Sequence, residues 1–370
     1  MERIHSGSPP IYGGRDAAST LDDLWSDEWR QAAVIGDSNT VRFAEPLVER
    51  LQRRCAEVVT LSFEAGEASK VRATKRYLED QLLARAFERS CCLVAVGGGV
   101  TTDLVGFVAA TLLRGVAHIN VATSLLAQID AAIGGKCGVN TPHGKNLIGA
   151  FHSPVAVLLD LAALDSLPAA ELSNGWAEGV KHAVLGDKEL FDEIEQAVIE
   201  RPDGALPLEP TLGQLSRMVA IKADIVARDE HERGRRQVLN FGHTVAHALE
   251  TASGHRVAHG QAVAIGMLVE AELARATYGF PEEEIARLRR VLARLGLPTT
   301  SPLSFSALRP HLRHDKKNRG GRVQCALPLR IGTIDQQAGR WTTPLDVREF
   351  ERAWGAVAED ALRNGQRVDD

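Results

Sequence analysis

The first half of the chain alternates short apolar runs with segments of helical spacing, and this alternation limits the possible folds more than any other feature. The apolar runs are four or five residues long and rich in β-branched side chains, which is typical of buried strands. They occupy residues 32–36, 58–62, 92–96, 118–121 and 155–159. Helical patterns, such as 41–54 and 70–89, separate them. This order predicts a parallel sheet covered by helices on both faces.

After Pro168 the pattern becomes almost entirely helical. Apolar residues recur at helical spacing in 169–184, 188–199, 212–227, 238–252, 261–276 and 281–295. Residues 324–329 are a candidate strand, and the polar tail after Val357 is expected to fray. The 370 residues therefore predict two domains, an α/β domain at residues 1–168 and a helical domain at residues 169–370.

Composition and charge exclude several classes of protein. The net charge of −5 gives no global basic field to hold nucleic acid. No uncharged apolar stretch reaches about 18 residues, and the N-terminus lacks the apolar region of a secretory signal. Five cysteines without a CxxC pair are typical of reduced thiols. We therefore expect a cytoplasmic protein with neither nucleic-acid nor membrane partners.

A glycine-rich turn follows the third candidate strand. In VGGGVTTD, residues 96–103, an apolar run enters three glycines and then an apolar helical pattern. Glycines there let a phosphate approach the backbone, and the start of the helix offers unpaired N–H groups. Asp103 is a candidate either to cap this helix or to contact the ligand. The motif is not GxGxxG, so a purely structural turn is the alternative.

A second glycine-rich stretch, residues 128–146, is unusually polar for its apolar surroundings. It holds Asp130, Lys136, Asn140, Lys145 and Asn146. A core would not tolerate unpaired lysines, and a solvated surface would not need the neighbouring glycine pair. The pattern favours a pocket for a phosphate or carboxylate, with an exposed lysine loop as the alternative.

Histidines cluster between residues 243 and 259. His243 and His247 are four residues apart and share one face of a predicted helix, which is typical of a metal site. His255 and His259 follow. Thr244 stands where HExxH would have its glutamate, so another ligand has to come from elsewhere in the chain.

Glu178 is a candidate for that ligand. It shares a helix face with Lys181 inside an apolar segment. Two histidines and one glutamate would leave metal positions open for a substrate alcohol. Three more cations, Lys222, Arg236 and Lys316, lie on or near apolar segments. Each of them taken singly fits a surface cation whose stem is buried.

Taken together, these motifs resemble the sugar phosphate cyclases, and the 3-dehydroquinate synthase branch most closely. The resemblance runs from about residue 32 to residue 334. Its motifs are GGGVTTDLVGF, LLAQIDAAIGGKCGVNTPHGKNLIGAFH, GWAEGVKH, KADIVARDEHERGRRQVLNFGHTVAH, AHGQAVAIGM and HDKKNRGG. Several long motifs in one order are far more specific than any single match.

The resemblance implies a Rossmann-like nucleotide-binding domain followed by a helical metal-binding domain. It implies a zinc site, with cobalt as an alternative ion, formed by Glu178, His243 and His259. His247 then contacts the substrate and is not a ligand, contrary to what helical spacing alone favours. Arg114 matches an arginine that the family contributes across a homodimer interface.

The resemblance also implies two further sets of site residues. The residues expected to bind NAD are Asp37, Asn39, Glu67, Lys70, Gly98, Gly99, Asp103, Thr123, Ser124, Lys136 and Lys145. Those expected to form the substrate pocket are Asp130, Lys136, Asn146, Lys181, Lys222, Arg236, Asn240, His247 and Lys316.

The reaction that the resemblance implies converts 3-deoxy-arabino-heptulosonate 7-phosphate to 3-dehydroquinate and phosphate. It combines oxidation by NAD, β-elimination of phosphate, reduction and intramolecular aldol closure, with no net redox change. Such a carbon–oxygen lyase belongs to the shikimate pathway and aromatic amino acid biosynthesis.

Other activities remain open at this point. An aminodehydroquinate synthase of antibiotic biosynthesis would keep nearly the same residues. Valiolone-type and deoxyinosose-type cyclases use substrates without a carboxylate, and we expect them to differ near Arg236, Asn240 and His247. A polyol dehydrogenase of the glycerol dehydrogenase type would not explain the polar stretch at residues 128–146. A catalytically silent relative would not need every expected ligand and cation.

Overall fold

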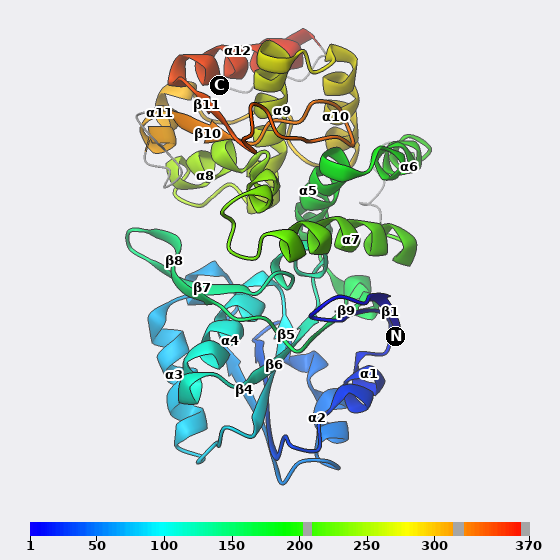
Figure 1. Cartoon of the computed structure of the whole chain (residues 1–370), viewed down its shortest axis with the longest axis vertical. Helices are drawn as coiled ribbons and strands as arrows, with labels where there is room; N and C mark the ends of the chain where they lie inside the picture. Colours follow the sequence, from blue (N-terminus) through cyan, green and yellow to red (C-terminus); the bar gives the residue numbers. More distant parts are fainter. Residues whose placement is uncertain (203–208, 314–321, 364–370) are drawn as a thin grey trace. The chain divides into compact units, whose positions relative to one another are not determined.

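The structure, a computed structural model, describes residues 1–202, 209–313 and 322–363 and divides into two compact units (Figure 1). The first unit comprises Met1–Pro168 and Pro210–Ala223, and the second comprises Ala169–Glu209 and Asp224–Asp370. The sequence did not predict that Pro210–Ala223 would group with the first unit.

The first unit contains a seven-stranded sheet in the order β1-β2-β9-β6-β5-β3-β4. Every neighbouring pair is parallel except β1 with β2. The strands are β1 (Glu2–His5), β2 (Ile11–Gly14), β3 (Gln31–Asp37), β4 (Glu57–Phe63), β5 (Cys91–Gly97), β6 (Ala117–Ala122) and β9 (Ala156–Asp160). The predicted α/β class with a parallel sheet is therefore confirmed, and β1 and β2 are additions that the sequence did not predict.

Apolar cores lie on both faces of this sheet. Alternate residues of a strand point to opposite faces, so Ala33 and Ile35 join one core while Ala32 and Val34 join the other. The first core includes residues of α3 (Arg72–Leu83) and α4 (Gly99–Thr111), and the second includes residues of α1 (Ala17–Leu24) and α2 (Glu45–Leu51). This two-sided burial explains why the strands are continuous apolar runs.

Two predicted helices of this unit are shorter than expected. The pattern at 41–54 divides into a 3₁₀ turn, Val41–Phe43, and α2, because Pro46 starts a new helix in its first turn. The pattern at 70–89 gives only α3, because Val71 is extended before it and Ala86 has a positive φ of 53° after it.

The polar stretch at residues 128–146 opens with a turn of π-helix, Ala127–Ala131, and continues into a β-hairpin. Strands β7 (Lys136–Thr141) and β8 (Gly144–Phe151) pair antiparallel. A Cβ at Gly138 would lie only 2.6 Å from the carbonyl oxygen of Ile148 on the partner strand. Close strand approach therefore explains part of the glycine content that the sequence attributed to ligand binding.

The second unit is helical, as predicted. Its helices are α5 (Ala169–Gly186), α6 (Lys188–Ile199), the end of α7 (Leu212–Arg228), α8 (His243–Ala252), α9 (His259–Tyr278), α10 (Glu282–Arg294), α11 (Phe305–Arg313) and α12 (Val347–Arg363). The candidate strand near residue 324 is present as β10 (Val323–Cys325), paired with β11 (Thr343–Leu345). Helix α12 continues past Val357 to Arg363, and the rest of the polar tail lies outside the described residues. None of the described helices has both the length and the apolar character needed to cross a membrane.

The helix predicted at 238–252 is interrupted before the histidines. A 3₁₀ segment, Arg235–Asn240, precedes Gly242, whose φ is +80°, and α8 begins only at His243. The buried carboxylate of Glu270 on α9 accepts hydrogen bonds from the N–H groups of Gly242, at 2.7 Å, and Thr244, at 3.1 Å. Glu270 therefore occupies the capping position at the start of α8.

Helices α8 and α9 pack closely at one glycine, which gives a test of this arrangement. A Cβ at Gly266 of α9 would lie 1.9 Å from the carbonyl oxygen of Gly242, so the backbones would have to separate. We predict that Gly266→Ala lowers the free energy of unfolding by about 1–3 kcal/mol in denaturant titration. The control Gly355→Ala on α12, where a Cβ meets nothing within 4 Å, should raise it by up to about 1 kcal/mol. Equal effects of the two variants would contradict the proposed close packing.

Candidate metal centre and ligand sites

Several residues expected to bind the cofactor lie at the carboxyl ends of parallel strands. Asp37 ends β3, Gly98 follows β5, and Thr123 follows β6. Glu67 lies four residues beyond the end of β4. Because these strands run parallel, their carboxyl ends share one edge of the sheet. This is the edge at which open α/β sheets bind their ligands.

The glycine turn leads directly into α4. Gly98 is the N-cap, Gly99 is the first helical residue, and a Cβ at Gly98 would lie 3.2 Å from Ser124 Oγ. Asp103 lies inside α4 and forms an ion pair with Lys70, so the suggestion that Asp103 caps the helix was wrong. Burial raises the pKa of Asp103, and the Lys70 ammonium opposes this rise.

The carboxylate of Asp37 organises the turn after β3. It accepts hydrogen bonds from the N–H groups of Asn39, at 2.9 Å, and Thr40, at 3.0 Å. The hydroxyl of Thr101 on α4 lies 3.3 Å from its other oxygen. Asn39 is exposed on this turn, so a ligand at this edge of the sheet could reach the Asn39 side chain while Asp37 fixes its backbone.

Asn140 joins two segments that the sequence treated separately. Its N–H donates to the Lys70 carbonyl at 2.7 Å, and its Nδ2 donates to Glu67 Oε1 at 2.7 Å. Its Oδ1 accepts from the N–H of Asn146 at 3.0 Å, where Asn146 has a positive φ of 52°. The sequence singled out Asn140 only as one polar residue in a stretch and missed this connecting position, because no local pattern pairs it with residues 67–70.

Lys222 is buried and paired with Asp130. Its Nζ donates to Asp130 Oδ1 at 2.6 Å and to the Asp130 carbonyl at 2.5 Å, and the residue is 5% exposed. This ion pair explains why a lysine lies in the apolar part of α7. The alternative, a surface cation with only its stem buried, does not fit so buried a residue. The expected cations Lys136 and Lys145 lie on the β7–β8 hairpin, Lys136 exposed and Lys145 partly buried.

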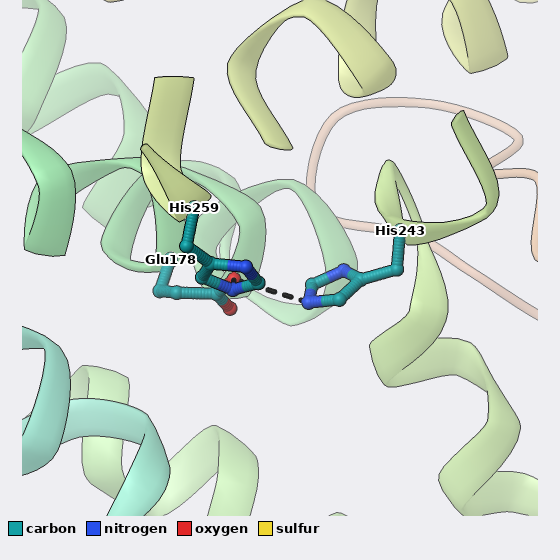
Figure 2. A group of neighbouring side chains, drawn as sticks. All are labelled: Glu178, His243 and His259. Atoms are coloured by element: carbon teal, nitrogen blue, oxygen red, sulfur yellow. Dashed lines mark ion pairs between the residues drawn. The ribbon is translucent and has the colours of Figure 1, made fainter. Parts of the chain in front are cut away.

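Glu178, His243 and His259 form a cluster of metal-binding type, shown in Figure 2. Glu178 comes from α5, while His243 and His259 are the first residues of α8 and α9. The two Nε2 atoms lie 3.3 and 3.4 Å from Glu178 Oε1. Ligand atoms around a tetrahedral zinc ion with bonds of about 2.0–2.1 Å lie about 3.3 Å apart, so the donor set and its spacing fit zinc.

His247, the partner that helical spacing favours for His243, is not part of this cluster. It is exposed on α8, and its ring centre lies 5.6 Å from that of His243. His259 reaches the cluster because the chain turns between α8 and α9. Spacing within one helix could not have predicted this contact.

The charges around the cluster favour the ionised form of Glu178 and the neutral form of His243, but they favour the protonated form of His259, which has to lose a proton to bind a metal. Although burial opposes it, Lys181 and His243 hold the pKa of the fully buried Glu178 carboxyl well below its usual value. Lys181 forms an ion pair with Glu178 from one turn along α5. Burial and the Lys181 charge lower the pKa of His243, which keeps its imidazole neutral. Burial lowers the pKa of His259, but hydrogen bonds with Glu178 and Glu250 outweigh it and raise the pKa to about 10.

The remaining expected residues differ in their burial and in their hydrogen-bond partners. Arg236 is 2% exposed and donates to the Glu230 carbonyl at 2.6 Å. Asn240 donates to Glu232 Oε1 at 2.8 Å, a partner that the sequence did not predict. Arg114 is exposed on a turn with a positive φ of 69°. Lys316 lies outside the described residues.

Comparison with known proteins identifies the family. The N-terminal 3-dehydroquinate synthase family matches residues 60–174, and the C-terminal family of the same name matches residues 175–318. The chain belongs to the 3-dehydroquinate synthase family. It is 42% identical over 361 residues to the 3-dehydroquinate synthase of Symbiobacterium thermophilum, which covers 94% of this chain and 97% of that protein.

Solved structures of sugar phosphate cyclases share the fold. A 2-epi-5-epi-valiolone synthase from Streptomyces hygroscopicus, with NAD+ and Zn2+ bound, is 28% identical, with a TM-score of 0.82 over 97% of this chain and 99% of that one. A 2-deoxy-scyllo-inosose synthase, complexed with carbaglucose-6-phosphate, NAD+ and Co2+, is 23% identical. Its TM-score is 0.79 over 93% of this chain and 96% of that one.

The cluster geometry predicts which changes remove metal binding. We expect His243→Ala, and likewise Glu178→Gln, to lose stoichiometric zinc when the purified protein is analysed by atomic emission. Each change removes one of three ligands or its charge, and three ligands are the minimum for such a site. The control is His255→Asn, because His255 is exposed with a φ of 62° that asparagine tolerates. Full zinc content in His243→Ala would refute this ligand set.

Proposed function

We propose that the protein is a sugar phosphate cyclase that converts 3-deoxy-arabino-heptulosonate 7-phosphate to 3-dehydroquinate and phosphate. The observation that carries the proposal is the Glu178–His243–His259 cluster in a chain of the 3-dehydroquinate synthase family. Cationic side chains lie near the cluster residues in the sequence or on the same helices. A substrate with two anionic groups requires such cations to bind it. We expect it to act in the cytoplasm and to serve aromatic amino acid biosynthesis.

The sheet edge of the first unit supports a role in holding NAD. When bound, NAD would supply a reversible hydride acceptor and be regenerated in each turnover. We assign the pyrophosphate to the start of α4 after Gly98, where unpaired N–H groups favour anions. We assign the cofactor contacts to the residues that the resemblance implies, with Lys70 held in place by Asp103.

The cluster in the second unit supports a role in holding zinc. Bound zinc would act as a Lewis acid toward an oxygen of the substrate. Glu178 supplies a charged ligand, and His243 and His259 supply Nε2 donors. Three protein ligands leave a coordination position for that oxygen. Lys181, 1% exposed and paired with Glu178, places a fixed positive charge beside the site.

The cations divide between the two anionic groups of the substrate. We assign the phosphate to the hairpin residues Lys136 and Asn146, together with Lys222, whose ammonium is held by Asp130. We assign the carboxylate to Arg236, because a guanidinium matches a planar carboxylate with two parallel hydrogen bonds. Asn240, His247 and Lys316 are the other residues that the resemblance assigns to the substrate, and Lys316 lies outside the described residues.

A second candidate is an aminodehydroquinate synthase or a valiolone-type cyclase of secondary metabolism. The observation in its favour is the likeness to a 2-epi-5-epi-valiolone synthase over almost the whole chain. Valiolone-type cyclases are expected to differ near Arg236, Asn240 and His247, and the presence of all three favours a substrate with a carboxylate.

A substrate comparison tests the proposed reaction. We expect steady phosphate release from 3-deoxy-arabino-heptulosonate 7-phosphate with catalytic NAD and no accumulation of NADH, because the cofactor is regenerated. The measurement runs the amino analogue and a carboxylate-free heptulose phosphate beside it. A strong preference for either alternative would reject the proposal in favour of the second candidate, and stoichiometric NADH would indicate a polyol dehydrogenase.

We also propose a homodimer in which Arg114 contributes to the active site of the partner subunit. Its exposure on a positive-φ turn supports a residue that reaches outward. Arg114→Ala and His243→Ala should each be inactive, but mixing them after joint unfolding and refolding should restore partial phosphate release. Restoration requires one subunit to supply the arginine and the other the histidine. If Arg114 acted within its own chain, no mixed dimer would contain a complete site and activity would stay absent.

A further inference from the structure

We propose that Glu250 is a positioning residue for the metal centre, orienting His259 and strengthening it as a ligand. Glu250 lies near the end of α8 and is 3% exposed. Its Oε1 lies 3.5 Å from Nδ1 of His259. The inference rests on the proposed metal site, and it assigns a role to a residue that neither the motifs nor the cluster itself includes.

The two histidines of the cluster are held in the same way but by different groups. Each presents Nε2 to Glu178 Oε1, at 3.3 Å for His243 and 3.4 Å for His259. Each presents Nδ1 to an oxygen on its other side. For His243 this is the carbonyl oxygen of Phe241, at 3.2 Å, and for His259 it is the Glu250 carboxylate.

This arrangement sets the tautomer of each ring. An acceptor at Nδ1 keeps the proton on that nitrogen and leaves the Nε2 lone pair for the metal. A carboxylate accepts more strongly than a neutral carbonyl does, and it increases the electron density that the imidazole can donate. His259 is therefore the stronger of the two imidazole donors, and Glu250 is the reason.

The backbone around Glu250 also fixes where His259 begins α9. The Glu250 carbonyl accepts from the N–H of His255 at 2.7 Å and from Ser253 Oγ at 3.0 Å, which shapes the turn after α8. At the far side of that turn, Asn174 on α5 accepts a hydrogen bond from the N–H of Gly260. The His259 ring is thus placed between carboxylates from α5 and α8, and hydrogen bonds hold the turn before it and the residue after it.

A purely structural role for Glu250 makes a different prediction. If its carboxylate only supported the turn between α8 and α9, its loss would weaken folding of the metal-free protein and leave the intrinsic metal affinity of the folded form unchanged. Metal affinity and metal-free stability therefore have to be measured separately on the full-length protein.

The experiment compares Glu250→Gln with the matched control Glu272→Gln. Glu272 is a buried carboxylate on α9 that pairs with Arg275, so the chemical change is the same but the metal ligands are not contacted. Zinc affinity is measured by competition with a chromophoric chelator, and the cobalt-substituted proteins are compared by visible absorption. Urea titration of the metal-free proteins reports folding.

We expect Glu250→Gln to weaken zinc binding about 10- to 100-fold and to shift the cobalt spectrum, because glutamine keeps an acceptor but loses its charge. Glu272→Gln should match the wild type in both. Wild-type affinity and spectrum in Glu250→Gln would overturn the inference, as would equal losses in the two variants. Absence of zinc binding by the wild type would instead refute the metal site itself. If Glu250→Gln does not fold, Glu250→Asp, which keeps the charge at a greater distance, replaces it and should show the same weakening.

Discussion

The fully buried carboxylate of Glu178 constrains how the helices of the second unit pack around it. Burying an ionised carboxylate costs several kcal/mol unless positive groups and hydrogen-bond donors surround it. Lys181 supplies charge from the same helix, and the Nε2 atoms of His243 and His259 approach from two other helices. Three helices have to converge for this carboxylate to be tolerated, and their convergence also creates the three-ligand set.

The close packing of α8 and α9 fixes how these two helices converge. Glycines at positions 242 and 266 allow the start of α8 to lie against the middle of α9. The Glu270 carboxylate then occupies the end of α8 where N–H groups lack helical partners. His243 and His259, the candidate metal ligands, are both first residues of helices, so their positions depend on how each helix begins more than on the face that it presents.

The sequence predicted the architecture better than the geometry of the sites. Apolar runs and helical spacing report burial, so they predicted strands β3, β4, β5, β6 and β9 and most helices correctly. They could not predict that His259 would join His243, because a turn with positive φ at Gly254 and His255 separates the two helices and carries no periodic signal. That contact was expected only from the resemblance to a known family. Asp103 was misjudged as a possible cap because its ion pair with Lys70 joins residues 33 positions apart. The contacts of Asn140 with residues 67–70 went unrecognised for the same reason, and Glu250 was missed because the turn between α8 and α9 brings it to His259.

The hydrogen bonds of Asn140 have a thermodynamic consequence. One side chain and its backbone tie residues 67–70 to the hairpin turn at residue 146. A ligand that orders either segment therefore reduces the conformational freedom of the other, and the entropy lost in ordering the pair is lost only once. The first molecule to bind leaves a smaller cost for the second. Because linkage is reciprocal, we expect each of two ligands at these segments to raise the affinity of the other by the same factor.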